Sequence, residues 1–200
     1  MTPQPLPQIY LARHGETAWS LSGQHTGLTD IPLLDVGERN AIQLGQRLKG
    51  MTFSRVFTSP LQRARRTCEL AGFGAVAAID PDLVEWNYGQ YEGKSTEEIH
   101  KINPGWDLFR DGGPGGESVA DVSARADRVI SRLRAINAAV LLFASGHILR
   151  VLTARWLALE ASAARYFIVG TASLNILGYE HNTNEPVIRL LDDRSHIKAG

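Results

Sequence analysis

The sequence predicts an α/β fold in three layers, with a mostly parallel central sheet between two layers of helices. Short apolar runs alternate along the chain with segments of helical periodicity, as is typical of parallel strands joined by helices. The longest apolar run, 138–144, has the length of a buried central strand. Parallel strands end on one edge of their sheet and ligands bind there, so residues that directly follow strands are the first site candidates.

Length and composition indicate a single domain over residues 1–200, with flexible ends at 1–8 and 192–200. The chain has 200 residues, of which 44% are apolar and 21% charged, as is usual for a globular protein with a substantial core. The 21 basic and 21 acidic residues balance. No overall field therefore favours nucleic acid or an anionic membrane surface.

Two further features favour a cytoplasmic protein. The longest apolar run is too short to span a bilayer, and residues 1–8 carry three prolines but no signal-like region. The single cysteine, Cys68, excludes an internal disulfide and fits a reducing compartment. Cys68 shares a predicted helix face with other apolar side chains, so we expect it to fill the core rather than act as a nucleophile.

The first part of the chain predicts a strand, a loop and a helix. Residues 9–12 form an apolar strand, and the polar stretch 20–32 is long enough to be a binding loop. Asp35 and Glu38 then form a predicted capping box, and Gly50 ends the helix. The inner face of this helix carries Ala41, Leu44, Gly45 and Leu48.

The next predicted unit is a strand over 55–58 followed by a helix. Ser59, Pro60 and Gln62 stand where an N-cap, a first-turn proline and a third-position glutamine are favoured. Arg63 therefore lies in the first turn and a half, where its side chain can share a phosphate with the helix N-terminus.

The middle of the chain predicts a strand over 76–79, an extended segment over 83–88 that carries Glu85, and a short helix over 96–102. Residues 111–116 form a glycine-rich loop. Ser118 and Asp121 begin another helix, whose apolar stripe is Val119, Val122, Ala126, Val129 and Leu133.

The last third begins with the central strand, over 140–144, and a helix after Ser145-Gly146-His147. The apolar face of that helix is predicted at Leu149, Leu152, Trp156 and Leu159. Further strands are predicted over 167–169, 174–178 and 187–190.

Arg13-His14-Gly15-Glu16-Thr17 directly follows the first strand, at the edge where such sheets bind ligands. A neutral imidazole can attack phosphorus, and the resulting phosphohistidine can be hydrolysed. Arg13 suits phosphate oxygens, and Gly15 allows backbone amides to approach closely. The alternative for these residues alone is a plain strand end with a solvated arginine and a hydrogen-bonded histidine.

Three motifs in order resemble those of the histidine phosphatase superfamily, which includes the cofactor-dependent phosphoglycerate mutases. They are the segment 13–17, the segment 59–64 with Thr67, and Glu85-Trp86-Asn87-Tyr88-Gly89 with Glu92-Gly93. The resemblance implies a phosphoglycerate mutase-like fold, with His14 as the phosphorylated nucleophile. It also implies that Arg13 and Arg63 bind the transferred phosphoryl group and that Glu85 donates a proton to the leaving oxygen.

The same resemblance implies a second group of residues, which would contact phosphate or substrate. It includes Ser20, Thr26, Gly27 and Tyr88. Ser20 stands where many relatives have asparagine, and either side chain can donate a hydrogen bond to a phosphate oxygen.

One position departs from the family pattern. Relatives carry a second catalytic histidine just before a glycine, where this chain has Ser145, and a histidine follows two residues later at His147. In one interpretation His147 supplies the missing hydrogen bond and positive charge. In the other, Ser145 gives only a neutral hydrogen bond and His147 packs locally, at a cost of about 10²- to 10³-fold in rate.

No grouping of histidine, cysteine and carboxylate has the spacing of metal ligands, so we expect no metal and no cofactor. The remaining histidines lack partners at recognisable spacing, and surface or packing roles are expected for them. They are His25, His100, His181 and His196.

Shared segments favour a resemblance to small broad-specificity acid phosphatases and fungal-type sedoheptulose bisphosphatases. These include Trp19-Ser20, Thr26 to Asp30 and Gly116-Glu117-Ser118. The resemblance implies a phosphatase for small phosphorylated metabolites, among which sugar phosphates are one candidate. Two alternatives remain, a phosphoglycerate mutase and a phosphate- or phosphoprotein-binding module with little turnover. The mutases are expected to be longer and to carry a basic contact where this chain has Thr96. No residue pattern predicts an oligomeric state.

Overall fold

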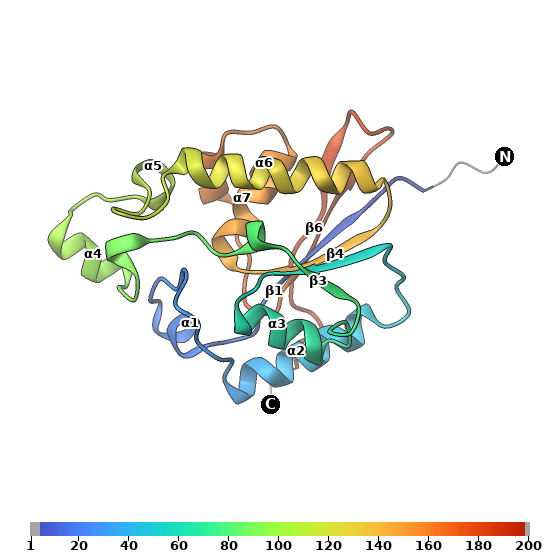
Figure 1. Ribbon diagram of the computed structural model, residues 1–200, viewed down its shortest axis with the longest axis horizontal. Helices are drawn as coiled ribbons and strands as arrows, with labels where there is room; N and C mark the ends of the chain where they lie inside the picture. Colours follow the sequence, from blue (N-terminus) through green and yellow to red (C-terminus); the bar gives the residue numbers. More distant parts are fainter. Residues whose placement is uncertain (1–4, 199–200) are drawn as a thin grey trace.

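The computed structural model describes residues 5–198 and contains one six-stranded sheet with the strand order β3-β2-β4-β1-β5-β6 (Figure 1). Strands β3, β2, β4 and β1 are parallel, whereas β5 and β6 are antiparallel to their neighbours. The mostly parallel α/β fold that the sequence predicts is confirmed. The strands are β1 (Ile9–Arg13), β2 (Arg55–Thr58), β3 (Ala77–Ile79), β4 (Val140–Ala144), β5 (Leu174–Tyr179) and β6 (Pro186–Asp193).

Two pairs of helices cover the two faces of this sheet (Figure 1). Helices α6 (Val119–Ile136) and α7 (Gly146–Trp156) lie on one face, and α2 (Asp35–Leu48) and α3 (Gln62–Leu70) lie on the other. Strand β4 is buried along its whole length because both faces are covered. The sheet is therefore the middle of three layers, and its carboxyl edge is free to carry a site.

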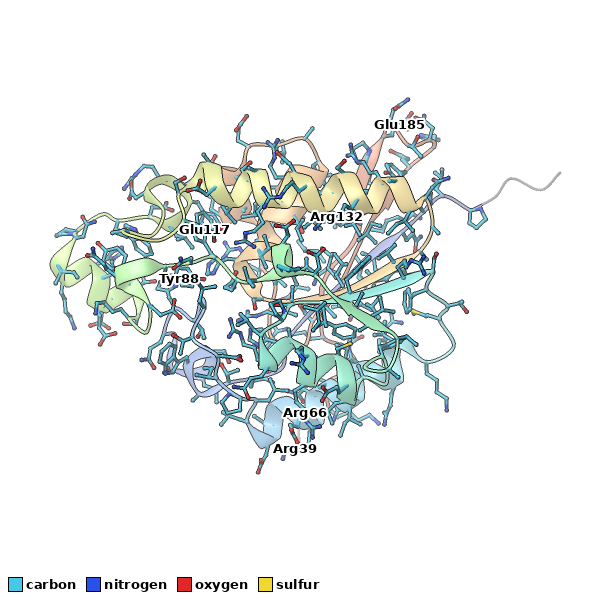
Figure 2. The ribbon with its side chains drawn as sticks, in the orientation of Figure 1. Arg39, Arg66, Tyr88, Glu117, Arg132 and Glu185 are labelled. Carbon is cyan, nitrogen blue, oxygen red and sulfur yellow. The ribbon has the colours of Figure 1, made fainter. Side chains whose placement is uncertain are left out.

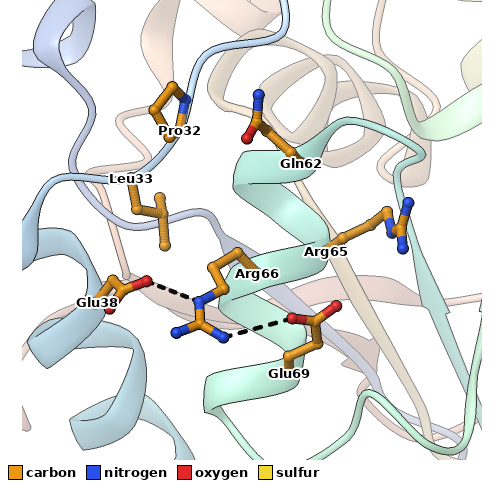
Figure 3. Close-up of a pocket in the computed structure, with 7 residues that line it drawn as sticks. All are labelled: Pro32, Leu33, Glu38, Gln62, Arg65, Arg66 and Glu69. Carbon is orange, nitrogen blue, oxygen red and sulfur yellow. Dashed lines mark hydrogen bonds and ion pairs between the residues drawn. The ribbon is translucent and has the colours of Figure 1, made fainter.

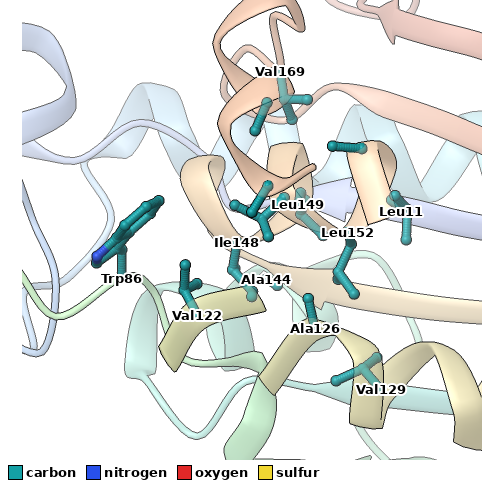
Figure 4. Packing of buried hydrophobic residues seen from close by; sticks show 14 of the residues in the cluster. Leu11, Trp86, Val122, Ala126, Val129, Ala144, Ile148, Leu149, Leu152 and Val169 are labelled. Atoms are coloured by element: carbon teal, nitrogen blue, oxygen red, sulfur yellow. The ribbon is translucent and has the colours of Figure 1, made fainter. Parts of the chain in front are cut away.

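The larger part of the core lies between the sheet and the α6–α7 layer (Figure 4). The predicted stripe of α6 is buried there against Leu149 and Leu152 of α7. Leu159 was wrongly predicted to continue the apolar face of α7, because the helix ends at Trp156 and Leu159 is exposed. The opposite core contains Cys68, for which a core position was predicted and is found.

Helix starts show how local sequence signals compete with tertiary contacts. The capping box of Ser118 and Asp121 is present at α6. The boxes predicted at Asp35 and Ser59 are wrong, since Leu34 and Leu61 are the N-caps and neither makes a side-chain capping bond. The carboxylate of Glu38 instead accepts a hydrogen bond from Arg66 of α3, which ties α2 to α3.

Several short helices at the carboxyl edge surround the end of β1 (Figure 1). The predicted helix 96–102 is α4 (Thr96–Ile102), whereas three other short helices were missed because each has only one or two turns. The strand predicted over 167–169 is wrong, because these residues have no strand pairing. The missed elements are α1 (Ala18–Ser22), α5 (Leu108–Asp111) and the 3₁₀ helix η3 (Ala161–Tyr166), and the 3₁₀ turns are η1 (Pro81–Leu83) and η2 (Gly89–Tyr91).

The carboxyl-terminal segment that the sequence predicted as flexible has defined contacts over its described part. Asp192 and Asp193 belong to β6, and the amide of Lys198 donates to Gln43 of α2 at 2.8 Å. Residues 1–4 and 199–200 lie outside the described residues, so the prediction for them stays a prediction. Within residues 5–198, no helix is long and apolar enough to cross a membrane.

Candidate active site

His14 and Ser145 emerge side by side because β1 and β4 are parallel neighbours in register. Arg13 pairs with Ala144, and the amide of His14 donates to the carbonyl of Ala144 at 3.0 Å. The loop after His14 packs closely on α2, where a Cβ on Gly15 would lie 2.3 Å from the carbonyl oxygen of Gly37. A glycine is therefore required at this turn by its packing on α2, whereas the sequence predicted it from the approach of backbone amides to a phosphate.

The ring of His14 is oriented by its own loop. Its Nδ1 lies 2.7 Å from the carbonyl oxygen of Gly15, which can only accept, so Nδ1 carries the proton and Nε2 keeps its lone pair. Burial holds the pKa of His14 well below its usual range, and the adjacent Arg13 and Arg63 lower this pKa further. The imidazole is therefore neutral at neutral pH, with the unprotonated nitrogen available as a nucleophile.

Arg13 places an unused donor beside His14. Its Nη1 donates to the carbonyl of Val169 at 2.7 Å, while its Nε is buried without a partner among the described residues. Burial lowers the pKa of Arg13, and the carboxylate of Glu85 acts in the opposite direction. A Cβ on Gly146 would lie 3.1 Å from the guanidinium carbon, so glycine at the start of α7 leaves room for this side chain.

Arg63 is fully buried at the start of α3 and holds the loop that was predicted to bind substrate. Its Nη1 donates to Thr29 O at 2.9 Å, and its Nη2 donates to Thr26 O and Gly27 O at 3.1 and 2.8 Å. Its Nε, like that of Arg13, has no partner among the described residues. A buried donor without an acceptor is costly, so an oxygen of a bound anion is a natural partner for each of these nitrogens.

Ser145 adds a third unused polar atom at the same edge. Its side chain is fully buried, and its Oγ has no hydrogen-bond partner among the described residues. Although Ser145 is the N-cap residue of α7, its hydroxyl does not cap the helix. That hydroxyl therefore remains available as a neutral donor, as one of the two sequence interpretations requires.

The Glu85 carboxylate caps α7 instead. Its Oε1 accepts from the amides of Trp86 and Ile148 at 2.9 and 2.8 Å, and its Oε2 accepts from the amide of His147 at 2.8 Å. The two α7 amides belong to the first turn, where a helix favours negative charge. These bonds fix the carboxylate at the end of the strand that leads to Ser145.

His147 and Tyr88 form a hydrogen-bonded pair beside this carboxylate. The hydroxyl of Tyr88 lies 2.6 Å from Nδ1 of His147, and the same Nδ1 lies 3.9 Å from Oε2 of Glu85. Burial holds the pKa of His147 well below its usual range, and Arg150 is the largest of the charges that lower it further. Burial also raises the pKa of Tyr88 well above its usual range, so both groups are neutral at neutral pH.

These side chains line one cavity of about 170 Å³. Of the sequence-predicted site residues, the lining includes Arg13, His14, Ser20, Thr26, Glu85, Tyr88 and His147. Arg63, Gly27 and Ser145 do not line it. Arg63 donates hydrogen bonds to the carbonyls of Thr26 and Gly27, and Ser145 directly follows the end of β4. Sequence reasoning missed Trp19, Gly23, Gln24 and His25, which also line it.

His25 is the most informative of the missed residues. It was expected to have a surface or packing role, yet its ring lies 4.8 Å from that of Tyr88 and 6.0 Å from that of His147. Its partner Thr96 lies 3.2 Å from Nε2 but 71 residues away in the chain, so no local spacing could signal the contact. The shared segments Trp19-Ser20, Gly23-Gln24 and Thr26 to Asp30, which flank His25 in the sequence, were the available indication.

Two of the predicted substrate contacts have structural tasks of their own. The Ser20 hydroxyl donates to Thr17 O at 3.0 Å and accepts from Thr17 N at 2.8 Å in the capping box of α1. The amide of Gly27 donates to Glu92 at 2.7 Å, and a Cβ there would lie 2.5 Å from Trp86 O. Gly27 therefore shapes the loop that Arg63 holds, and it does not face the cavity.

A buried ion pair holds the segment that carries Glu85. Arg125 of α6 donates from Nε and Nη2 to the two carboxylate oxygens of Glu117, at 2.9 and 2.7 Å. Its Nη1 also donates to the carbonyls of Asp82 and Val84, and Glu117 accepts from the amide of Asn87. The segment 82–87 is thus fixed on both sides of Glu85.

Two other features lie away from this cavity. A hollow of about 360 Å³ lies between α2 and α3 (Figure 3), and of the two arginines that line it, Arg66 is paired with Glu38 and Glu69. In the described chain, Glu180, His181 and Glu185 could meet at one ion in the turn between β5 and β6. This exposed turn lies at the opposite end of the sheet, as the labels of Tyr88 and Glu185 show in Figure 2. His181 does have a partner at i,i+4, contrary to expectation.

Cys68 has the properties expected of a core residue. It is buried in α3, and burial raises its pKa to about 12. The thiol stays protonated at neutral pH and is a poor nucleophile.

A neutral histidine with a free nitrogen, two buried arginines with unused donors and a fixed carboxylate define a protein that handles phosphate esters. The comparison with protein families agrees. Residues 9–193 match the model of the histidine phosphatase superfamily (branch 1), and the chain belongs to this family.

The sequence relatives carry three different activity names. The chain is 38% identical to an acid phosphatase of Mycobacterium tuberculosis, over 96% of this chain and 97% of that protein. It is 34% identical to a sedoheptulose 1,7-bisphosphatase of Saccharomyces cerevisiae, over 78% of this chain and 70% of the relative. It is 31% identical to a probable phosphoglycerate mutase GpmB of Cronobacter sakazakii, over 96% and 95%.

The fold comparison points the same way. A solved structure of an open reading frame from M. tuberculosis superposes with a TM-score of 0.88 at 36% identity, covering 92% of this chain and 96% of that one. Together these findings make the protein a phosphomonoesterase of the histidine phosphatase family.

Proposed function

We propose that this chain hydrolyses small phosphomonoesters, sugar phosphates among them, through a phosphohistidine intermediate on His14. One observation carries the proposal. The free Nε2 of a neutral His14 lies in one cavity with Glu85, and the unpartnered Nε atoms of Arg13 and Arg63 lie beside it. A nucleophile, an anion cradle and a proton donor are the parts that phosphoryl transfer needs.

In the first step, Nε2 of His14 attacks phosphorus and the bond from phosphorus to the ester oxygen breaks. The leaving oxygen takes a proton from Glu85, while Arg13 and Arg63 neutralise charge on the equatorial oxygens. In the second step, water attacks phosphorus and the bond from phosphorus to Nε2 breaks. The proton of that water goes to Glu85, which restores the starting state.

The hydrogen bonds of Glu85 favour Oε2 as its proton-carrying oxygen. Both lone-pair directions of Oε1 are used by the amides of Trp86 and Ile148, whereas Oε2 accepts from one amide only. A proton on Oε2 is therefore compatible with every bond that Glu85 makes. General acid catalysis of this kind contributes about 10²- to 10⁴-fold.

Hydrolysis is favoured over mutase activity by the residue at the rim. Thr96 stands where the mutases were expected to carry a basic contact, and its hydroxyl lies 3.2 Å from Nε2 of His25. The expected difference in length does not apply to the GpmB relative, which the alignment covers to 95%. The absence of a basic residue at position 96, and not length, therefore supports hydrolysis.

The third possibility, a phosphate-binding module, would leave His14 and Glu85 without a task. A binder needs donors for phosphate oxygens but neither a nucleophile nor an acid. The unpartnered hydroxyl of Ser145 fits either role. We also propose that the protein is metal-independent and cytoplasmic. The free, buried Cys68 supports the cytoplasmic location, because a free thiol fits a reducing compartment.

A phosphate-release screen tests this proposal. p-Nitrophenyl phosphate, sugar phosphates and 3-phosphoglycerate are assayed from pH 5 to 8, with and without a metal chelator, beside His14→Ala. We expect release that the chelator leaves unchanged and that His14→Ala abolishes. Isomerisation of phosphoglycerate without net hydrolysis would instead support a mutase, and no release under any condition would support the binding module.

A further inference from the structure

The half of the cavity that faces away from the phosphate cradle is lined by aromatic and neutral polar groups. Trp19, Gln24, His25 and Tyr88 form it, and His147 adjoins it next to Glu85 of the reacting end. Among the described residues that line the whole cavity, Arg13 supplies the cation and Glu85 the carboxylate. Both charges belong to the reacting end, so the rest of the lining is a surface for the leaving group.

The imidazoles in and next to this half carry no charge at neutral pH. Burial lowers the pKa of His25 to about 4, and burial together with neighbouring charges holds that of His147 well below its usual range. Among the described residues, hydrogen bonds use only one ring nitrogen of each, to Thr96 and Tyr88 respectively. The other nitrogens can exchange hydrogen bonds with hydroxyl groups.

Arg150 does not supply the missing cation. It lies outside the lining, and its Nε and Nη2 donate to the carbonyls of Ala164 and Arg165 at 3.0 and 3.1 Å. Its guanidinium also lies 4.6 Å from the ring centre of Phe109. The Arg150 guanidinium is thus occupied by backbone carbonyls and by the ring of Phe109, and not by a group in the cavity.

We propose that this half of the cavity selects uncharged, hydroxyl-bearing leaving groups and discriminates against substrates that carry a second phosphate or a carboxylate. The inference rests on the proposed phosphatase function. A second anion entering here would lose water without gaining a counterion. A sugar or polyol chain instead meets aromatic faces and neutral hydrogen-bonding groups.

Matched substrate pairs measure this selectivity. Glycerol 3-phosphate and 3-phosphoglycerate differ by one carboxylate, and fructose 6-phosphate and fructose 1,6-bisphosphate differ by one phosphate. We expect kcat/KM to favour the first member of each pair by about tenfold or more. Competitive inhibition of p-nitrophenyl phosphate hydrolysis by the same four compounds separates binding from turnover.

A gain-of-charge variant provides the sharper test. His25→Lys introduces a cation into the leaving-group half, and His25→Gln is its neutral control. We expect His25→Lys to raise kcat/KM for 3-phosphoglycerate by about tenfold relative to glycerol 3-phosphate, and His25→Gln to leave this ratio unchanged. Thermal melting shows whether each variant folds.

The outcomes separate this inference from the proposed function. Efficient hydrolysis of p-nitrophenyl phosphate with equal or better use of the doubly anionic substrates would overturn the inference alone. A His25→Lys variant that folds but leaves the ratio of the pair unchanged would overturn it as well. Release from none of the compounds, p-nitrophenyl phosphate included, would overturn both.

Discussion

The hydroxyl of Tyr88 lies 2.6 Å from Nδ1 of His147, and we take the hydroxyl as the donor of this hydrogen bond. Burial raises the pKa of Tyr88, so its hydroxyl keeps its proton, and Nδ1 is the hydrogen-bond partner of that hydroxyl among the described residues. With Nδ1 accepting, the proton of the neutral His147 ring lies on Nε2. His147 can therefore present an N–H group to a ligand in the cavity, in place of the histidine that the family resemblance implies at the position of Ser145.

The two candidates for this donor give the first prediction. His147→Ala should slow phosphate release by about 10²-fold, as expected when a donor to the reacting group is lost. Ser145→Ala should cost less, since the fully buried Ser145 does not line the cavity, whereas His147 does. Steady-state rates with p-nitrophenyl phosphate compare the two variants. Equal and small effects would show that neither residue replaces the displaced histidine.

Tyr88→Phe removes the hydroxyl that sets the protonation of His147. We expect kcat/KM to fall about tenfold, which corresponds to roughly 1.4 kcal/mol and to the loss of one hydrogen bond. The effect should be absent when His147 is already alanine, because the hydroxyl acts through that ring. A double-mutant cycle measures this coupling, and additive losses would refute it.

Arg125→Met should destabilise the fold because it leaves the carboxylate of Glu117 partly buried without its partner. The side chains of Arg125 and Glu117 are only 7% and 21% exposed, and breaking a buried pair costs about 3–5 kcal/mol. Arg128→Ala is the matched control on the same helix, since Arg128 is 57% exposed in its pair with Asp82 and should cost less than about 1 kcal/mol. Urea denaturation compares the variants. Similar midpoints would contradict the positioning role of Arg125.

The depressed pKa of His14 predicts how its ring responds to pH. Because burial and two arginines oppose protonation, the ring should stay neutral down to well below pH 6.5. The nucleophile is the neutral form, so activity should not be lost through His14 until that lower pH is reached. Nitrogen NMR of the His14 ring follows the titration and the Nδ1–H form directly. Half-protonation at pH 6.5 or above would contradict the burial argument.

Helices and strands could be predicted from the sequence wherever a local pattern alone determines where the element begins and ends. β2, β4 and α4 match their predicted ranges because apolar runs and flanking signals coincide there. The errors lie where a distant contact decided the local structure. Glu38 is a partner of Arg66 and not of a capping position, and residues 167–169 provide the Val169 carbonyl that accepts from Arg13 instead of pairing as a strand.

The site residues also fall into two groups, those that a local motif predicts and those whose position depends on distant contacts. The motif residues His14 and Arg13 could be placed because strand ends at one sheet edge must converge. His25 and the pairing of Tyr88 with His147 could not, since the partners are 71 and 59 residues apart. Glu85 was predicted as the proton donor from the resemblance, but its capping of α7 depends on a sheet edge and a helix start that meet only in the fold.

The central claim is that His14 carries the phosphoryl group. Mass spectrometry of enzyme quenched in alkali during turnover tests it most directly, because phosphohistidine survives alkali and is lost in acid. We expect a phosphoryl group on His14 that is removed by acid, is missing in His14→Ala and persists in His25→Gln. Continued phosphate release with the group on another residue, or undiminished release by His14→Ala, would contradict it.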